Sequence, residues 1–255
     1  MLPDKKIIAF DIDGTLTVSK RPISEGMASL IKELIKRKMV ITIAGGSFKQ
    51  LETQFLPPFF KDESMLPFIS NFVLLPTSGS QRYQFDEVQK KWMLKDKEPL
   101  AVEIREKAKK LLKEIIDSGQ YDVPPNPKGE IVEDRETQVT FSALGQQAPI
   151  EEKILWDPDQ SKRKKIVAVI GPQLPGATVL INSVSSIDIL PKGFNKAVGL
   201  TRFLDKAGFK KSDVIFIGDG IFPGGNDYAV KEAGFETIAV GGPKETEVII
   251  KGWLG

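Results

Sequence analysis

The chain has 255 residues, 41% of them hydrophobic, with 36 basic and 34 acidic side chains and a net charge of +2. This composition is ordinary for a folded globular protein, so it excludes a disordered chain and gives no electrostatic basis for binding nucleic acid. Cys and His are both absent, which excludes disulfides, thiolate nucleophiles, Cys-ligated zinc and imidazole chemistry. Asp, Glu, Lys, Ser and Thr remain for covalent or acid–base steps.

Membrane and secretion signals are also missing from the sequence. No apolar run approaches the length needed to cross a bilayer, and the N-terminal residues lack the pattern of a cleavable signal. We therefore expect a cytoplasmic protein without a membrane partner.

The first predicted element is a buried parallel strand at residues 7–10, which are all apolar. It ends in two carboxylates, Asp11 and Asp13, followed by Gly14 and the hydroxyl of Thr15. Asp and Gly are ordinary turn formers, so this segment alone fits either a plain polar turn or a ligand site. Carboxylates at the end of a central strand lie where open α/β sheets bind ligands. They suggest attack on phosphorus by one carboxylate, proton transfer by the other, and a divalent cation bound by both.

A helix and two further buried strands follow. Ser24 is a suitable N-cap for a helix with apolar residues at helical spacing, and residues 39–44 form the second strand. The segment 45–47, Gly-Gly-Ser, then precedes a new helix from residue 48. Glycines and a hydroxyl at a helix N-terminus suit a phosphate, with a tight structural turn as the alternative. Residues 72–75 form a third strand.

The pattern changes after residue 75, where alternating polar and apolar residues predict antiparallel strands. The charged run 161–165 leads into β-branched residues, so the region 150–171 is compatible with helix or strand. We expect an α+β segment at 86–186, inserted into a core formed by 1–85 and 187–255. The elements predicted for this part of the chain are two strands in 76–97 around a turn near Asp86, a long amphipathic helix at about 99–118, one or two strands in 130–145, and strands at 177–181 and 185–190.

Alternating strands and helices return after Pro191. Asn195 is a suitable N-cap for the next helix, and the apolar strand 214–217 ends in an acid, Asp219. The loop 220–227 is too rich in glycine and acids for a plain connection. A strand at 237–240 and a short helix from 243 to about 251 complete the predicted elements.

Polar residues thus follow four predicted strands: Asp11 and Asp13, Ser47, Lys192 or Lys196, and Asp219 with Asp227. The ends of parallel strands share one edge of a sheet, so residues that are distant in sequence meet there. Mg²⁺ prefers carboxylate oxygens, and Lys and Ser suit the oxygens of a transferring phosphoryl group.

In this order, the four motifs resemble those of the haloacid dehalogenase (HAD) superfamily: DIDGT at 11–15, Ser47, the Lys in PKGFNK, and GDGIFPGGND at 218–227. The inserted segment resembles the type IIB cap of that superfamily. Within it, the motifs FDIDGTLT, GGS, SSIDILPKGFNK and PGGND are most similar to those of eukaryotic-type phosphomannomutases. The resemblance implies an α/β fold, with a Rossmann-like parallel-sheet core and an inserted α+β cap that selects the substrate.

The resemblance also implies roles for residues of the core. Asp11 is the nucleophile that forms an aspartyl-phosphate, and Asp13 is the general acid–base residue. Asp11, the main-chain carbonyl of Asp13, and Asp219 are the implied Mg²⁺ ligands. The remaining implied roles are phosphate binding by Ser47 and Lys196, which matches the family lysine better than Lys192, and support of the metal loop by Asn226 and Asp227.

In the cap, Arg135, Ser186 and Asp188 fall where the mutases bind the sugar phosphate. Gln146 stands where the mutases carry a second arginine, which is suited to holding the distal phosphate while the bisphosphorylated intermediate turns round. Lys153 and the cations of 162–165 are candidates to replace this charge, although such a run is also typical of solvated surface.

Because Gln146 is neutral, we expect net hydrolysis of a small phosphorylated sugar. One alternative is a phosphomannomutase that interconverts mannose 1-phosphate and mannose 6-phosphate. A second is a non-catalytic sugar-phosphate-binding protein on the same fold. A homodimer formed through the cap is a further expectation, and nucleic acid is not an expected partner.

Overall fold

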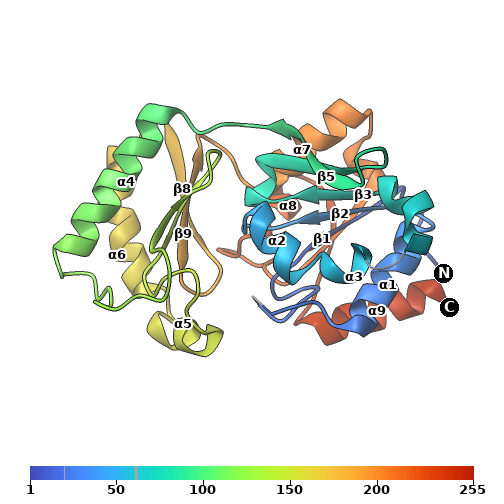
Figure 1. The fold of residues 1–255 in the computed structure, drawn as a ribbon, viewed down its shortest axis with the longest axis horizontal. Helices are drawn as coiled ribbons and strands as arrows, with labels where there is room; N and C mark the ends of the chain where they lie inside the picture. The colour runs from blue at the N-terminus through green and yellow to red at the C-terminus, as the bar shows by residue number, and fades with distance from the viewer. Residues whose placement is uncertain (20, 61–62) are drawn as a thin grey trace. The chain divides into compact units, whose positions relative to one another are not determined.

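The computed structural model describes residues 1–19, 21–60 and 63–255, which form two compact units (Figure 1). Unit 1 consists of Met1–Lys97 and Asn195–Gly255, and unit 2 consists of Glu98–Phe194. No helix in the described ranges combines the length and the apolar character needed to span a membrane.

Unit 1 is built on a seven-stranded sheet with the strand order β11-β10-β1-β2-β3-β4-β5. Neighbouring strands from β11 to β3 are parallel, and β4 and β5 extend the sheet as an antiparallel hairpin. The strands are β1 (Ile7–Asp11), β2 (Met39–Ile43), β3 (Phe72–Leu75), β4 (Gln81–Asp86), β5 (Lys91–Lys97), β10 (Val214–Gly218) and β11 (Glu236–Ala239). The strands predicted from apolar runs are therefore confirmed.

Helices surround this sheet, and several begin at the predicted caps. The side chains of Ser24 and Asn195 accept hydrogen bonds from the backbone N–H groups of Met27 and Val198, each at 3.1 Å. The α-helices are α1 (Glu25–Ile35), α2 (Phe48–Gln54), α3 (Pro57–Phe60), α7 (Lys196–Ala207), α8 (Tyr228–Glu232) and α9 (Pro243–Leu254). Short 3₁₀ helices are η1 (Glu63–Asn71), η2 (Thr77–Gly79) and η4 (Lys211–Asp213).

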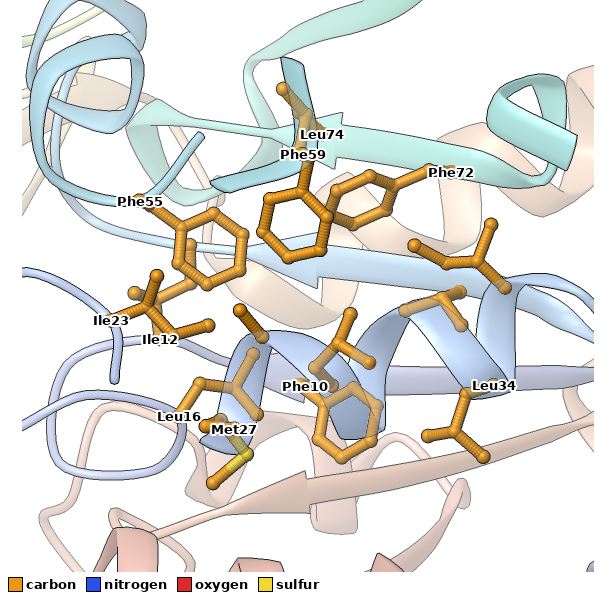
Figure 2. Close-up of a cluster of buried hydrophobic side chains, with 14 of the residues drawn as sticks. Phe10, Ile12, Leu16, Ile23, Met27, Leu34, Phe55, Phe59, Phe72 and Leu74 are labelled. Atoms are coloured by element: carbon orange, nitrogen blue, oxygen red, sulfur yellow. The ribbon is translucent and has the colours of Figure 1, made fainter. Parts of the chain in front are cut away.

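The core of unit 1 has two apolar layers, one on each face of the sheet. Successive residues of a strand point to opposite faces, so Ile8 and Phe10 of β1 belong to one layer and Ile7 and Ala9 to the other. Figure 2 shows part of the first layer, where Phe10 lies near Met27 and Leu34 of α1 and aromatic rings of α3 and β3 pack above them. α7 and α8 contribute to the second layer. Burial of β1 on both faces explains its uninterrupted apolar sequence.

Unit 2 contains a four-stranded antiparallel sheet with the order β6-β7-β9-β8. Val139, Phe141, Ile187 and Ile189 lie on its apolar face, which packs with residues of α4 and α6. The strands are β6 (Val132–Asp134), β7 (Val139–Ser142), β8 (Ala177–Asn182) and β9 (Ser186–Pro191). The helices are α4 (Val102–Asp117), α5 (Ile150–Trp156), α6 (Ser161–Ile170) and the 3₁₀ helix η3 (Gly171–Gln173).

The unit boundaries differ from those expected at 86 and 186. Hydrogen bonds from β3 to β4 and from β4 to β5 extend the sheet of unit 1 as far as Lys97. β9 pairs with both β7 and β8, so unit 2 continues to Phe194. Alternation in the sequence identified these strands, but it carries no information about which sheet a strand joins.

The ambiguous region 150–171 is helical rather than extended. In α6, Arg163, Ile166 and Ile170 are buried, whereas Val169 is exposed. These buried positions recur at helical spacing, so packing in unit 2 overrides the β propensity of the branched residues.

Candidate active site

Polar residues converge at the carboxyl edge of the parallel strands in unit 1. Asp11 is the last residue of β1, and Asp219 directly follows β10, the neighbouring strand. Lys196 is the first residue of α7, and Asp227 directly precedes α8. Residues from both ends of the chain therefore meet at this edge, as the sequence predicts for strand ends.

Lys196 joins two of the acids through short, buried ion pairs. Its Nζ lies 2.6 Å from Asp11 Oδ1 and 2.6 Å from Asp227 Oδ1. The three side chains are at most 3% exposed, so water does not screen these interactions. Lys192, the other lysine considered, is exposed.

Asp11, Asp219 and Asp227 form a compact acidic cluster. One carboxylate oxygen from each lies within 4.8 Å of the other two. Asp11 Oδ2 is buried and accepts no hydrogen bond from any described residue. The cluster includes the side chain of Asp227, which the sequence had suggested only as a supporting residue.

The environment shifts the pKa values of these groups. Burial raises the pKa of Asp11 well above its usual range; the ammonium of Lys196 opposes this rise, and the carboxylates of Asp227 and Asp219 add to it. Burial, and then Asp227, also raise the pKa of Asp219. For Lys196, burial alone would lower the pKa, but Asp11 and Asp227 outweigh it and raise the pKa above its ordinary value. When ionised, the three carboxylates of the cluster outnumber the single ammonium of Lys196.

Gly14 and Thr15 hold Asp219 in the cluster. The backbone N–H of Asp219 donates to Thr15 Oγ1 at 2.9 Å, and Thr15 Oγ1 donates to Asp219 Oδ1 at 3.3 Å. Gly14 has a φ of +86°, and a Cβ on it would lie 2.2 Å from Asp219 Oδ2. The position therefore requires glycine both for its backbone angle and for the approach of Asp219.

The glycine-rich loop after β10 wraps around the side chains of Asn226 and Asp227. Asp227 Oδ2 accepts a hydrogen bond from the N–H of Gly220 at 3.0 Å. A Cβ on Gly220 would lie 2.2 Å from Asn226 Oδ1, and one on Gly218 would lie 2.4 Å from Asp227 Oδ2. Close approach to these two side chains explains the glycines at 218 and 220.

Asp13 lines a small pocket in unit 1. The other polar residues of the lining are Thr17, Arg21, Gln50 and Gln54, and Gly46 and apolar side chains complete it. Ser47 is the N-cap of α2 and accepts a hydrogen bond from the N–H of Gln50 at 3.4 Å. It follows Ile43, the partner of Asp11 in the β1–β2 register, so it belongs to the same edge of the sheet.

Thr15 and Arg21 are the residues of this region that the sequence reasoning did not assign. The sequence indicates Thr15 only as a hydroxyl of the turn, although it directly follows the Asp-x-Asp-Gly segment. Arg21 follows the same motif shortly before the N-cap Ser24. In the sequence, Arg21 is a cation between an acidic strand end and the start of a helix. Whether its side chain faces the site depends on the path of the loop, which the sequence does not specify.

Three predicted cap residues lie on or beside the sheet of unit 2. Asp188 accepts hydrogen bonds from Thr140 Oγ1 at 2.9 Å and from Asn182 Nδ2 at 2.5 Å. Ser186 precedes it by two positions and therefore shares its polar face. Arg135 directly follows β6, and its guanidinium pairs with Glu133 Oε2 at 2.6 Å.

Gln146 and its candidate replacements for positive charge are also in unit 2. Gln146 Nε2 is buried and finds no acceptor within the part of the chain that the structure describes. Lys153 is fully buried, and its Nζ donates to the main-chain oxygen of Gln146 at 2.9 Å. Arg163 is buried against Asp157, which corrects the expectation that the run 162–165 is solvated surface at this position.

Sequence similarity relates the chain to known proteins. A family model described as eukaryotic phosphomannomutase matches residues 27–254. A phosphomannomutase of Saccharomyces cerevisiae is 29% identical over 230 residues, covering 88% of this chain and 84% of that protein. A phosphomannomutase of Encephalitozoon cuniculi is 28% identical over 252 residues, covering 95% of this chain and 91% of that protein.

A solved structure shows the same fold. The crystal structure of a haloacid dehalogenase-like hydrolase from Bacteroides thetaiotaomicron superposes with a TM-score of 0.62 at 16% identity. The match covers 97% of this chain and 98% of that one. At this identity the likeness concerns the fold, and it confirms the predicted α/β core with a separate antiparallel sheet.

Proposed function

Because the chain belongs to the eukaryotic phosphomannomutase family of the haloacid dehalogenase superfamily, an enzyme family of phosphoryl transfer, we propose that it moves the phosphoryl group of a phosphorylated sugar through Asp11. One observation carries this proposal: Asp11 is held through Oδ1 by Lys196, while its buried Oδ2 accepts no hydrogen bond from the described residues. An oriented carboxylate oxygen without a competing donor is suited to attack on phosphorus.

The reaction has two steps. In the first, a carboxylate oxygen of Asp11 forms a bond to phosphorus, the bond from phosphorus to the sugar oxygen breaks, and Asp13 gives its proton to that oxygen. In the second, water attacks the phosphorus of the aspartyl-phosphate, Asp13 takes up a proton, and the bond to Asp11 breaks to release phosphate. Asp13 is suited to exchange protons with a substrate because it lines a pocket rather than the buried cluster.

Positive and hydroxyl groups would bind the transferring phosphoryl oxygens. Lys196 is held rigidly by Asp11 and Asp227, so its ammonium needs no reorganisation when negative charge develops nearby. Ser47 is the second candidate, at the same edge of the sheet. Arg21, at the pocket with Asp13, is a third.

The acidic cluster fits a Mg²⁺ ion. When ionised, the three carboxylates outnumber the ammonium of Lys196 by two charges, and one oxygen from each lies within 4.8 Å of the other two. Hard oxygen ligands of this kind suit Mg²⁺. Asp11, Asp219 and the main-chain carbonyl of Asp13 would hold the ion, with Asn226 and Asp227 supporting the loop. When bound, Mg²⁺ would supply positive charge to the phosphoryl oxygens.

We assign recognition of the sugar phosphate to unit 2, through Arg135, Ser186 and Asp188. The two hydrogen bonds to Asp188 fix the orientation of its carboxylate on the polar face of the sheet. Arg135 supplies a guanidinium beside this sheet, and such a group binds phosphate in a bidentate manner.

We favour net hydrolysis as the outcome. A mutase needs to retain its bisphosphorylated intermediate, and the neutral Gln146 does not provide the charge of an arginine. Lys153 is fully buried with its Nζ on the carbonyl of Gln146, an arrangement that supports a structural role for this lysine. Phosphomannomutase-type isomerisation is the second candidate, and the match to the family model over 27–254 favours it.

Asp11→Asn tests the nucleophile. The amide keeps the size of the side chain but is a very poor nucleophile, so we expect release of phosphate from sugar phosphates with Mg²⁺ to fall by at least about three orders of magnitude. A circular dichroism spectrum and melting curve like those of the wild type would exclude unfolding as the cause. An unchanged rate would contradict the role of Asp11.

A single incubation separates hydrolysis from isomerisation. Mannose 1-phosphate is supplied with Mg²⁺ and a catalytic amount of hexose bisphosphate, and both mannose 6-phosphate and free phosphate are measured. We expect phosphate release to exceed isomerisation. Faster formation of mannose 6-phosphate would reverse the order of the two candidates.

A further inference from the structure

The short helix η2, between β3 and β4, has an unusual backbone. Thr77, Ser78 and Gly79 have φ angles of 51°, 57° and 84°, so three successive residues occupy the left-handed region. Two of them carry side chains that disfavour this conformation, and Thr77 and Ser78 are both buried. Such strain persists only where the surrounding contacts determine the backbone, and it is concentrated at functional sites.

One side of η2 holds the loop that leads to Ser47. The N–H of Thr77 donates to the carbonyl of Gly46 at 2.9 Å, and the N–H of Ser78 donates to the carbonyl of Ala44 at 2.7 Å. A trans peptide carries its C=O and N–H on opposite sides, so the N–H of Ser47 points away from η2. The left-handed turn thus fixes the orientation of this loop.

The strand that follows η2 adds a second contact to the same loop. The ring of Tyr83 in β4 stacks on the ring of Phe48, which directly follows Ser47, with centroids 3.9 Å apart and an angle of 6° between the planes. The position of Ser47 is therefore fixed from the backbone of η2 and from a side chain of β4.

The other side of η2 contacts the backbone of α7. A Cβ on Gly79 would lie 2.8 Å from the Cα of Gly199, and a Cβ on Gly199 would lie 2.6 Å from the carbonyl oxygen of Ser78. The two glycines therefore let η2 and α7 touch without side chains between them. Gly199 lies three positions after Lys196, on the adjacent turn of α7.

We propose that η2 and Tyr83 act as a positioning element that fixes the separation between Ser47 and Lys196, and hence the width of the phosphate site. This proposal rests on the proposed function, because it matters only if both side chains bind one phosphoryl group. Strain in η2 is explained by the need to meet the Ser47 loop and α7 at the same time.

Gly199→Ala is the first test, with Gly26→Ala as its control. Both changes add a methyl group within a helix, but the methyl at Gly26 meets nothing within 4 Å. We expect Gly199→Ala to weaken the binding of inorganic phosphate with Mg²⁺ and to lower kcat/KM by roughly 10- to 100-fold, whereas Gly26→Ala leaves both unchanged.

Tyr83→Leu is a milder second test, in case Gly199→Ala does not fold. It removes the stack on Phe48 from a partly buried position. Phe85→Leu is its control, since Phe85 lies on the same strand but packs against Trp92 at 5.8 Å. We expect weaker phosphate binding for Tyr83→Leu alone, with both variants melting at similar temperatures.

Double variants that combine Ser47→Ala with Gly199→Ala or Tyr83→Leu show whether η2 positions Ser47 or only contributes to packing. If η2 sets the separation, the loss of phosphate affinity caused by Ser47→Ala is smaller in the Gly199→Ala or Tyr83→Leu background than in the wild type. If Ser47→Ala instead lowers phosphate affinity by the same factor in these backgrounds as in the wild type, the positioning role is overturned and the proposed function stays intact. A Ser47→Ala variant and a Lys196→Met variant that both retain wild-type phosphate affinity and activity would overturn the proposed function, and this proposal with it.

Discussion

Gly14 contributes to the acidic cluster because it has no side chain. Its φ of +86° is unfavourable for any other residue, and its missing Cβ leaves room for the carboxylate of Asp219. Thr15 then fixes that carboxylate through its hydroxyl. Two adjacent residues of the first motif therefore determine where the carboxylate after β10 lies.

Gly14→Ala should therefore affect activity more than stability. We expect the left-handed alanine to lower the free energy of unfolding by about 1–2 kcal/mol, and the displaced Asp219 to lower kcat/KM by roughly 100-fold. Gly234→Ala is the matched control, because Gly234 has a φ of +84° and nothing within 4 Å of the added methyl. Denaturant unfolding and steady-state kinetics measure the two effects. Equal losses of activity in the two variants would contradict the role of Gly14.

The local sequence indicated which residues belong to this site, but it did not indicate which of them contact one another. Asp11 and Asp13 follow an apolar run, so their position at a strand end was readable from neighbouring residues. The contact between Lys196 and Asp227 depends on the path of the glycine-rich loop, which no local pattern specifies. The sequence could therefore suggest which residues take part, but not that Lys196 bridges two of the acids.

At the scale of elements, α6 is organised around a buried charge. The guanidinium of Arg163 contacts the carboxylate of Asp157 at 2.7 Å and donates to the main-chain oxygens of Asn182 and Ser183 at 3.2 and 2.9 Å. It thus connects the start of α6 to the turn between β8 and β9. The sequence suggested solvated surface because a buried arginine among lysines has no distinctive pattern, and its main-chain acceptors lie 19 and 20 positions away in the chain.

Arg163→Met tests the importance of this ion pair. Methionine fills much of the volume but leaves the buried carboxylate of Asp157 without its guanidinium, so we expect a loss of about 3–5 kcal/mol in unfolding free energy. Lys113→Met provides the control, since Lys113 pairs with Asp117 on an exposed face of α4 in the same unit. That pair is worth less than about 1 kcal/mol. Chemical denaturation of both full-length variants measures the difference, and equal stabilities would contradict a central role for Arg163.

At the scale of the whole molecule, the acidic cluster couples distant parts of the chain. Asp11 and Lys196 are separated by 185 positions, and unit 2 lies between them in the sequence. The cluster exists only when both segments of unit 1 have folded together. The sequence predicted this convergence because parallel strands share one carboxyl edge. The boundaries of the units instead depended on the pairing of β4 with β3 and of β9 with β7 and β8.

If Mg²⁺ binds the acidic cluster as proposed, it should stabilise unit 1. Burial raises the pKa values of Asp11 and Asp219, and neighbouring carboxylates add to this rise, so the ionised cluster disfavours the folded state when no cation is bound. A ligand that binds only the folded state at about 100 times its dissociation constant adds roughly 2.7 kcal/mol of stability. For a protein of this size, we expect the melting temperature to rise by about 5–10 °C with saturating Mg²⁺.

Asp219→Asn should remove most of this Mg²⁺-dependent rise, because it takes away a proposed ligand. The variant should also melt at or above the temperature of the wild type when no divalent cation is present, since one source of repulsion in the cluster is gone. Asp205→Asn changes the net charge equally at an exposed position of α7 and should respond to Mg²⁺ like the wild type. Differential scanning fluorimetry with Mg²⁺ and with a chelator measures all three proteins. An equal response of Asp219→Asn and the wild type would remove Asp219 from the metal site without affecting the assignment of Asp11 as nucleophile.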